Sequence, residues 1–103
     1  MKTRHEILME DAEFRRLLAV EALAAGAAEL IARLMAEQAV SRAELARRLG
    51  KSRAWVTQLL SGKGNLTVKT LAEAAFALGA ELRMEGRSMR SGRTAQTRPA
   101  RKG

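Results

Sequence analysis

The side chains of this chain that could do chemistry are mostly cations, and they gather around one glycine. Gly50 interrupts helix-spaced apolar residues in the stretch Ala46 to Gly62, ARRLGKSRAWVTQLLSG. Residues 41–69 contain one acidic residue, Glu44, against seven cations: Arg42, Arg47, Arg48, Lys51, Arg53, Lys63 and Lys69. A merely solvated face more often mixes the two signs, so this imbalance favours a phosphate-bearing partner.

Other kinds of chemistry find little support in the sequence. The one histidine, His5, lies in an N-terminal segment without clear periodicity, and we expect it to be exposed rather than catalytic. The acidic residues Glu10, Asp11 and Glu13 are explained by a helix start, where the helix dipole favours them, so no metal site is predicted. The loop Gly62-Lys-Gly64 lacks the spacing of a nucleotide-phosphate loop. We therefore predict no enzyme and no cofactor.

Length and composition favour a single small all-α domain. The chain has 103 residues, three aromatic residues and no tyrosine, and alanine, leucine, arginine and glutamate dominate. Without cysteine there is no disulfide or thiolate chemistry, and a reducing compartment is the natural inference. No apolar run is long enough to span a membrane, and the first residues lack a signal-peptide pattern. We expect a soluble cytoplasmic protein.

The N-terminal part of the sequence predicts helix on both sides of Gly26. Asp11 is expected to cap a helix to Ala25, and Gly26 then permits either a bend or a long helix that runs through it. A second amphipathic stretch covers residues 27–38. The first helix offers an inner face of Phe14, Leu17, Leu18 and Leu23, and the second a stripe of Leu30, Ile31, Leu34 and Met35.

The middle of the sequence contains three cap signals in succession. Ser41-Arg-Ala-Glu44 fits a capping box, in which the serine accepts from the third amide and the glutamate reaches back, so a helix is predicted over 42–49. Gly50 suits the left-handed residue that ends it, and Ser52 caps the next helix over 53–60. A loop follows, and Thr67 caps a last helix that ends near Leu78.

The C-terminal part has a different character. Residues 80–85 alternate polar and apolar side chains, which predicts a short extended segment against the domain or against a second copy. Residues 86–103 carry six basic and no acidic residues and little to bury, so a disordered basic tail is predicted. The predicted fold is a compact bundle of about five helices, with regions 1–26, 27–79, 80–85 and 86–103.

Two short helices joined by a tight glycine turn cross steeply and present the second helix outward. The residues predicted to pack between them are Leu45, Ala46, Leu49, Val56 and Leu59. The N-terminal half of the second helix could then enter a DNA major groove. The alternative is an ordinary helical hairpin inside a bundle, against which the charge imbalance argues.

Arg42 to Gly62 resembles the helix-turn-helix of the Cro and lambda-repressor-like superfamily, or XRE family, and the resemblance extends from about Ala27 to Gly79. It rests on Ala46, Gly50, Val56 and Leu59 at the expected offsets. The resemblance implies that base contacts come from Arg53, Ala54, Trp55 and Gln58. It implies phosphate contacts from Arg42, Ser52 and Lys63, and we add Lys51, Thr57 and Lys69 as supplements.

Two of the implied base-reading residues also have the right chemistry. Arginine can hold a guanine and glutamine an adenine through two hydrogen bonds each, which favours Arg53 and Gln58 as readers. Ala54 could touch a thymine methyl group, whereas Trp55 could contact DNA or equally cover the core.

These observations predict a transcriptional regulator, a repressor, that binds double-stranded DNA as a homodimer. Because one small motif buries little DNA, the spare apolar face of residues 11–25 is expected to serve dimerisation. Met9 to Arg15 also resembles the lead-in of host-inhibition-of-growth antitoxins, so an antitoxin that binds a toxin protein is the alternative. A helical scaffold without nucleic acid is a third.

Overall fold

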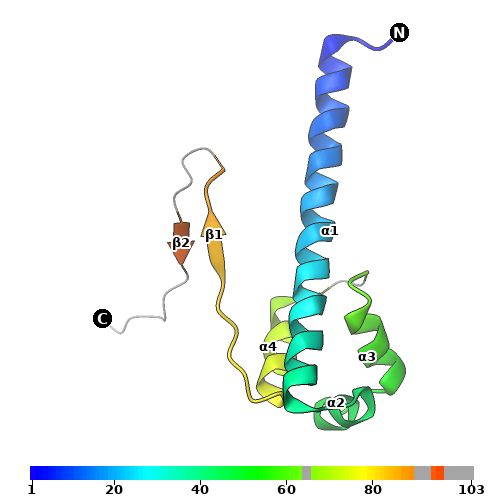
Figure 1. The fold of residues 1–103 in the computed structure, drawn as a ribbon. Coiled ribbons are helices and arrows are strands. Elements are labelled where there is room, and N and C mark those ends of the chain that lie inside the picture. The colour runs from blue at the N-terminus through cyan, green and yellow to red at the C-terminus, as the bar shows by residue number, and fades with distance from the viewer. Residues whose placement is uncertain (64–65, 90–93, 97–103) are drawn as a thin grey trace.

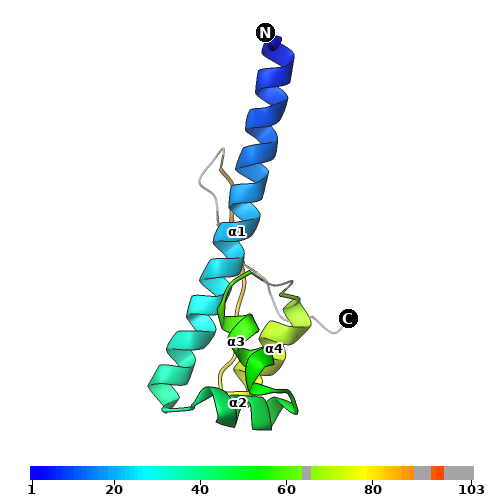
Figure 2. The same ribbon diagram turned by 90° about the vertical axis from the view of Figure 1, so that its right-hand side faces the viewer.

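The computed structural model describes residues 1–63, 66–89 and 94–96 of the chain. Its elements in chain order are the helices α1 (Arg4–Gln38), α2 (Arg42–Leu49), α3 (Arg53–Leu60) and α4 (Val68–Ala77), followed by the strands β1 (Glu85–Arg87) and β2 (Thr94–Gln96). α1 runs the height of the molecule, and the three short helices gather around its C-terminal part (Figures 1 and 2).

α1 is one helix where the sequence suggested two. It passes through Gly26, which was one of the two alternatives, so the described residues hold four helices rather than about five. The predicted cap at Asp11 is wrong: α1 begins at Arg4, and the Thr3 side chain accepts a hydrogen bond of 3.1 Å from the Glu6 amide. Thr3-Arg-His-Glu6 is itself a capping-box pattern, and this signal could have located the start.

The core lies between the C-terminal part of α1 and the three short helices. The largest fully buried side chains are Ile31 of α1, Leu45 of α2, Val56 of α3 and Leu78, the residue that caps α4. The predicted stripe of α1 is confirmed, with Ile31 and Met35 buried and Leu30 and Leu34 half-buried. We call residues 28–82 the body.

The predicted compactness holds for the body but not for the whole chain. The radius of gyration is 17.7 Å, whereas a globular chain of this length has about 13 Å. The N-terminal part of α1 extends away from the body, and its predicted inner face is exposed: 58% at Phe14, 56% at Leu17, 47% at Leu18 and 78% at Leu23. We call residues 4–26 the arm.

The caps predicted within the body are confirmed. Ser41, Ser52 and Thr67 accept hydrogen bonds from the amides of Glu44, Trp55 and Thr70, so α2, α3 and α4 begin where the sequence placed them. α1 ends at Ala39, which takes the left-handed conformation at φ 54° although it is not a glycine. That conformation costs an alanine about 1 kcal/mol relative to glycine.

After α4 the chain is extended, as predicted, and Leu82 packs partly buried against the core. Regular strand begins only at Glu85, where β1 pairs antiparallel with β2 in the register Glu85 to Gln96 and Arg87 to Thr94. Most of the predicted disordered tail, residues 86–103, lies outside the described residues. In its described part the structure has this short pair of strands, which the sequence did not predict.

Candidate nucleic-acid interface

The turn between α2 and α3 has the geometry that its sequence predicts. Gly50 lies at φ 65°, and its amide and that of Lys51 donate to carbonyls of the last turn of α2, the latter to Ala46 at 2.9 Å. Ser52 then takes an extended conformation, and its hydroxyl accepts from the Trp55 amide at 3.0 Å. A left-handed residue followed at once by a cap lets the chain reverse direction in three residues.

This turn packs α2 against α3 through small and medium apolar side chains. Leu45 and Val56 are fully buried, Ala46 and Leu59 are nearly so, and Leu49 is half-buried. Ala46 is 4% exposed where the helices meet, and a longer side chain there would push α3 away. The predicted contact set is confirmed, and it fixes which side of α3 points outward.

The outward side of α3 carries polar and small residues. Arg53, Ala54, Thr57 and Gln58 are exposed and lie within about 140° of one another around the helix. Three of the four residues predicted to read bases, Arg53, Ala54 and Gln58, therefore share this face. Trp55 differs, because it is half-buried and packs partly against the core. The sequence left open whether Trp55 contacts DNA or covers the core, and the structure shows its packing against the core.

Two pairs of the predicted contact residues are brought together across the turn. Arg42, at the start of α2, donates from its guanidinium to the Thr57 hydroxyl at 3.2 Å. The Lys51 ammonium lies 5.5 Å from the centre of the Trp55 ring, a cation–π arrangement that holds both side chains beside the N-terminus of α3. These contacts tie α2 and the turn to the outward face of α3.

The remaining predicted phosphate contacts come from the turn, from the loop after α3 and from α4. Lys51 and Lys69 line one hollow of about 320 Å³ together with Trp55, between the N-terminal turns of α3 and α4. Lys63 follows α3 in the loop, where its amide donates to the Ser61 hydroxyl at 3.2 Å. Arg42, Lys51, Ser52, Thr57, Lys63 and Lys69 are all exposed.

Two cations of the motif have a different partner. Glu44 accepts hydrogen bonds of 2.9 Å from Arg47 Nε and 2.8 Å from Arg48 Nε, instead of reaching back to the Ser41 amide as the capping box predicted. These hydrogen bonds, the one from Arg47 foremost, lower the pKa of Glu44 from 4.5 to about 2. The spacing of three and four residues was the signal for these pairs.

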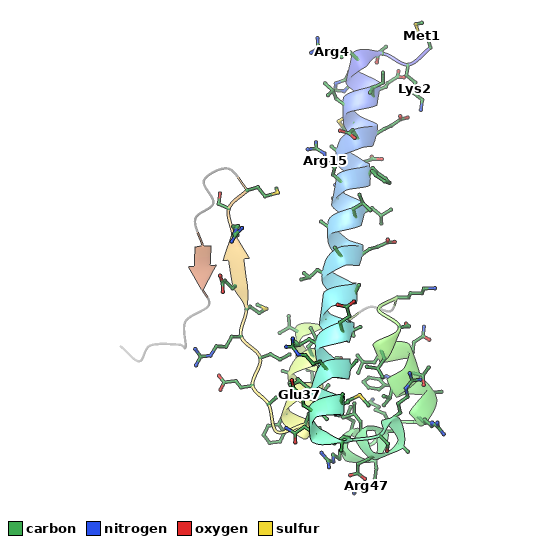
Figure 3. The ribbon with its side chains drawn as sticks, viewed as in Figure 1. Met1, Lys2, Arg4, Arg15, Glu37 and Arg47 are labelled. Atoms are coloured by element: carbon green, nitrogen blue, oxygen red, sulfur yellow. The ribbon has the colours of Figure 1, made fainter. Side chains whose placement is uncertain are left out.

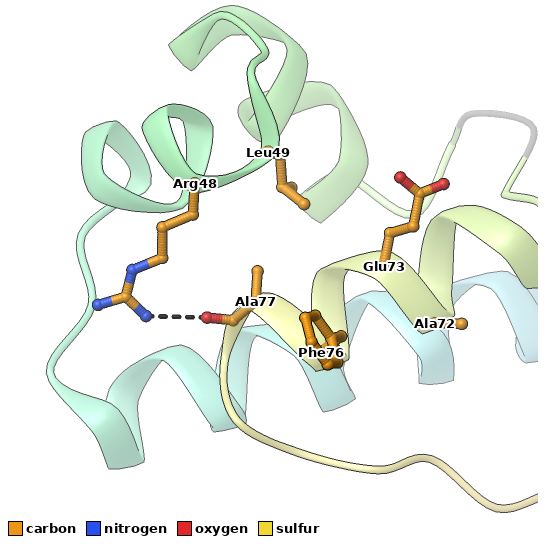
Figure 4. Close-up of a pocket in the computed structure, with 6 residues that line it drawn as sticks. All are labelled: Arg48, Leu49, Ala72, Glu73, Phe76 and Ala77. Atoms are coloured by element: carbon orange, nitrogen blue, oxygen red, sulfur yellow. Dashed lines mark hydrogen bonds between the residues drawn. The ribbon is translucent and has the colours of Figure 1, made fainter.

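Arg48 also holds α2 to α4. Its guanidinium donates to the Ala77 carbonyl at 2.9 Å, at the C-terminal end of α4, where a helix leaves carbonyls free (Figure 4). It lies at the rim of a hollow of about 650 Å³ between the two helices, which Leu49 and Phe76 also line. Arg47 and Arg48 thus act within the body, and the cations without such pairing are those predicted to contact DNA.

The part of the chain that the structure describes holds neither a cluster of metal ligands nor a helix suited to span a membrane. No group of three or more histidine, cysteine, aspartate or glutamate side chains in that part of the chain could hold a metal ion. His5 is exposed in the first turn of α1, a helix that begins earlier than the sequence suggested. No helix within the described ranges is both long and apolar enough to cross a membrane.

Two helices joined by a left-handed glycine, with the second presenting an unburied polar face, define a helix-turn-helix unit. A helix-turn-helix family model of the Cro/C1 type matches residues 31–83 of the chain. The chain therefore belongs to this family, the XRE family, and contains a DNA-binding helix-turn-helix domain. Neither the comparison with curated proteins nor that with solved structures found a match.

Proposed function

We propose that the protein is a sequence-specific transcriptional regulator that binds an operator as a dimer, with α3 in the major groove of each half-site. The observation that carries this proposal is the exposed face of α3, which holds Arg53 and Gln58 and to which Arg42 of α2 is hydrogen-bonded through Thr57. Such a face combines groups that read base edges with groups that neutralise phosphates.

Each residue has an assigned role. Arg53 holds a guanine and Gln58 an adenine through paired hydrogen bonds, and Ala54 meets a thymine methyl group. Trp55 contributes by its position, since it anchors α3 on the core while the Lys51 ammonium lies over its ring. The phosphate contacts come from Arg42, Lys51, Ser52, Thr57, Lys63 and Lys69, and these set affinity and register without reading sequence.

The Arg42 to Thr57 hydrogen bond positions a cation beside the exposed face of α3 before DNA binds. Because Arg42 already reaches across the turn to α3, its guanidinium is held where a phosphate beside the recognition helix would lie. Ser52 has its oxygen engaged as the helix cap and keeps its hydroxyl proton free to donate to a phosphate. We assign the regulator to repression because occupying an operator is sufficient for it, whereas activation needs a further contact.

The test is selection from random DNA duplexes at several salt concentrations. Arg53→Ala and Gln58→Ala should each cost about 1–3 kcal/mol on the selected site and relax the preference at one base pair. Lys63→Ala should weaken binding to all duplexes alike and reduce the salt dependence by about one ion. Arg33→Ala is the control, because Arg33 is exposed on α1 and pairs with Glu37.

A chain that retains no duplex at low salt would refute the proposal. So would base-reading variants that lower all affinities by one factor and leave the selected sequence unchanged. The alternative antitoxin role stays a prediction; its toxin would need a protein-binding surface, and the exposed arm of α1 is one such surface.

A further inference from the structure

The arm of α1 exposes more apolar surface than a helix in water ordinarily does. Seven large apolar side chains from Ile7 to Val20, and Leu23 beyond them, are between 47% and 78% exposed. α1 packs against α3 and α4, and the loop after α3 reaches the end of the arm, where Gly62 lies beside the Ala25 backbone. Before that point both views show the arm standing clear of the three short helices (Figures 1 and 2). An exposed apolar helix of this length indicates a surface that is covered in the working form of the protein.

One line along the arm has the spacing of a two-stranded coiled coil. Six positions separated alternately by three and four residues, which we call the seam, lie on one side of the helix. The seam consists of Arg4, Ile7, Asp11, Phe14, Leu18 and Glu21. It lies about 100° around the helix from Ile31 and Met35, so a partner on it would not compete with the body.

The charges of the seam disfavour a parallel partner. In a parallel pair in register each residue faces itself, so Arg4, Asp11 and Glu21 would each oppose a like charge. Identical charges at facing positions are destabilising. The three charged positions of the seam would then repel their counterparts, and its three apolar positions bury too little surface to offset that repulsion.

An antiparallel partner in one register makes the contacts of Arg4 and Glu21 attractive and no longer sets Asp11 directly opposite Asp11. If the two-fold axis passes between residues 12 and 13, Ile7 opposes Leu18 of the other copy and Arg4 opposes Glu21 of the other copy. Phe14 then covers the stem of Asp11, whose carboxylate lies one position from Arg15 of the other copy. In the structure Asp11 already stands 3.7 Å from Arg15 of its own helix, and Arg4 and Arg15 project from the same side of α1 (Figure 3).

We propose that two copies of this chain associate through their arms as an antiparallel helix pair in this register. Asp11 and Phe14 of both copies lie nearest the axis, Ile7 packs against Leu18 on either side of them, and the Arg4 to Glu21 contacts close the two ends. The operation is a closed two-fold, so the interface is satisfied by two copies and does not extend further.

This helix pair specifies how the dimer of the proposed function would form. Its consequence for the operator rests on that proposed function. The body of each copy begins about 23 Å from the axis, and the two Ile31 residues lie about 56 Å apart along the helices at about 1.5 Å per residue. Half-sites one turn apart are separated by about 34–36 Å. The operator is therefore expected to have half-sites more than one turn apart.

Cysteine cross-linking of the full chain tests the direction of the pair, since the chain has no cysteine of its own. Asp11→Cys and Ala22→Cys place thiols on the same side of α1, about 20° apart. In the proposed register the two thiols at position 11 are offset by about 4.5 Å along the axis and the two at position 22 by about 28 Å. Under mild oxidation the first variant should form a covalent dimer and the second should not.

A parallel pair would cross-link both variants alike, and that result would overturn the proposal. Cross-linking of Ala22→Cys alone, or of neither variant, would also overturn it. Circular dichroism of each variant shows whether α1 is still formed, so that loss of the helix is not mistaken for loss of the pair.

A charge exchange tests the register by sedimentation equilibrium without DNA. Arg4→Glu and Glu21→Arg should each weaken dimerisation by about tenfold, because each reverses two symmetry-related contacts. The double variant restores both contacts with exchanged signs and should return to within about threefold of the unmodified chain. Arg33→Glu, on the same helix but outside the arm, is the control and should leave the dimerisation constant unchanged.

A chain that stays monomeric at several hundred micromolar, or a double variant that is no better than the single ones, would overturn the proposal. Monomeric protein that still selects a DNA sequence would refute only this inference and leave the proposed function standing. Dimers without DNA binding would do the reverse, so the two failures are distinguishable.

Discussion

The body and the arm are parts of one continuous helix, yet they are held by different forces. In the body, Ile31 is fully buried and packs with residues of α2, α3 and α4. About two turns before it, Leu23 of the same helix is 78% exposed. The body obtains its stability from tertiary packing, whereas the arm depends on helix propensity, its cap at Thr3 and its connection to the body. The comparison shows that helix propensity and a cap are enough to form the arm, whereas the short helices of the body need a shared core.

The largest difference between the two regions should appear on truncating a leucine in each. Leu45→Ala removes a fully buried side chain and should lower the free energy of unfolding by about 2–5 kcal/mol. Leu23→Ala lies in the arm and off the seam, and should change it by less than about 0.5 kcal/mol. Denaturant titration followed by circular dichroism measures both. Equal losses would mean that the arm packs against something in this chain, contrary to the structure.

The next effect concerns the point where the body contacts the arm. Gly62 lies at φ 71°, and a Cβ there would approach the Ala25 Cα to 3.2 Å. Gly62→Ala should therefore cost about 2–3 kcal/mol, from the left-handed conformation and from the displaced turn. Gly79→Ala is the matched control, since Gly79 has φ 69° but open space around it, and it should cost about 1 kcal/mol. If thermal unfolding gives equal losses for both, the contact with Ala25 contributes nothing.

A third change should strengthen the arm. Gly26 lies in the interior of α1 at its junction with the body, and a Cβ there would meet no atom within 4 Å. Gly26→Ala should stabilise the helix by about 1 kcal/mol, because alanine loses less backbone entropy. Hydrogen exchange should show slower opening of the arm amides next to it, with little change in α2. Faster exchange there would argue for a bend at Gly26 rather than a continuous helix.

The smallest effect concerns surface charge in the body. The hydrogen bonds from Arg47 and Arg48 keep the pKa of Glu44 at about 2, below the 4.5 of the unfolded chain. A lowered folded pKa gives a stabilising contribution that is complete above about pH 4.5 and is lost as the pH falls towards about 2. Glu44→Gln should remove this part of the acid dependence and leave the arm unchanged. Identical acid titrations of the melting temperature for both proteins would mean that the ion pairs contribute nothing in solution.

The helix boundaries of the body could be read from the sequence because they are decided over few residues. Ser41, Gly50, Ser52 and Thr67 each act on amides or carbonyls within about five positions, so their types alone locate the ends of helices. The same rule would have placed the start of α1 at Thr3, had the capping pattern there been weighed above the lack of periodicity in residues 1–9.

The exposed face of α3 could also be predicted from the sequence, because burial of Val56 and Leu59 leaves the opposite side of the helix outward. The sequence did not separate the cations by role. Arg48 is engaged by Glu44, four residues before it, and by the Ala77 carbonyl across a helix contact. The second of these partners lies 29 residues away in the chain. Contacts between distant segments carry no local signature.

What the sequence by itself determined is the set of elements of the body: three capped short helices, the glycine turn and the small, apolar positions that let α2 and α3 meet. What only the tertiary structure decided is which apolar side chains of α1 find a core. Phe14 and Leu18 have the same kind of periodicity as Ile31 and Met35, and differ only in that three short helices reach the second pair and not the first. Periodicity states that a face is apolar, but the length of α1 relative to the helices that cover it determines where burial within one chain stops.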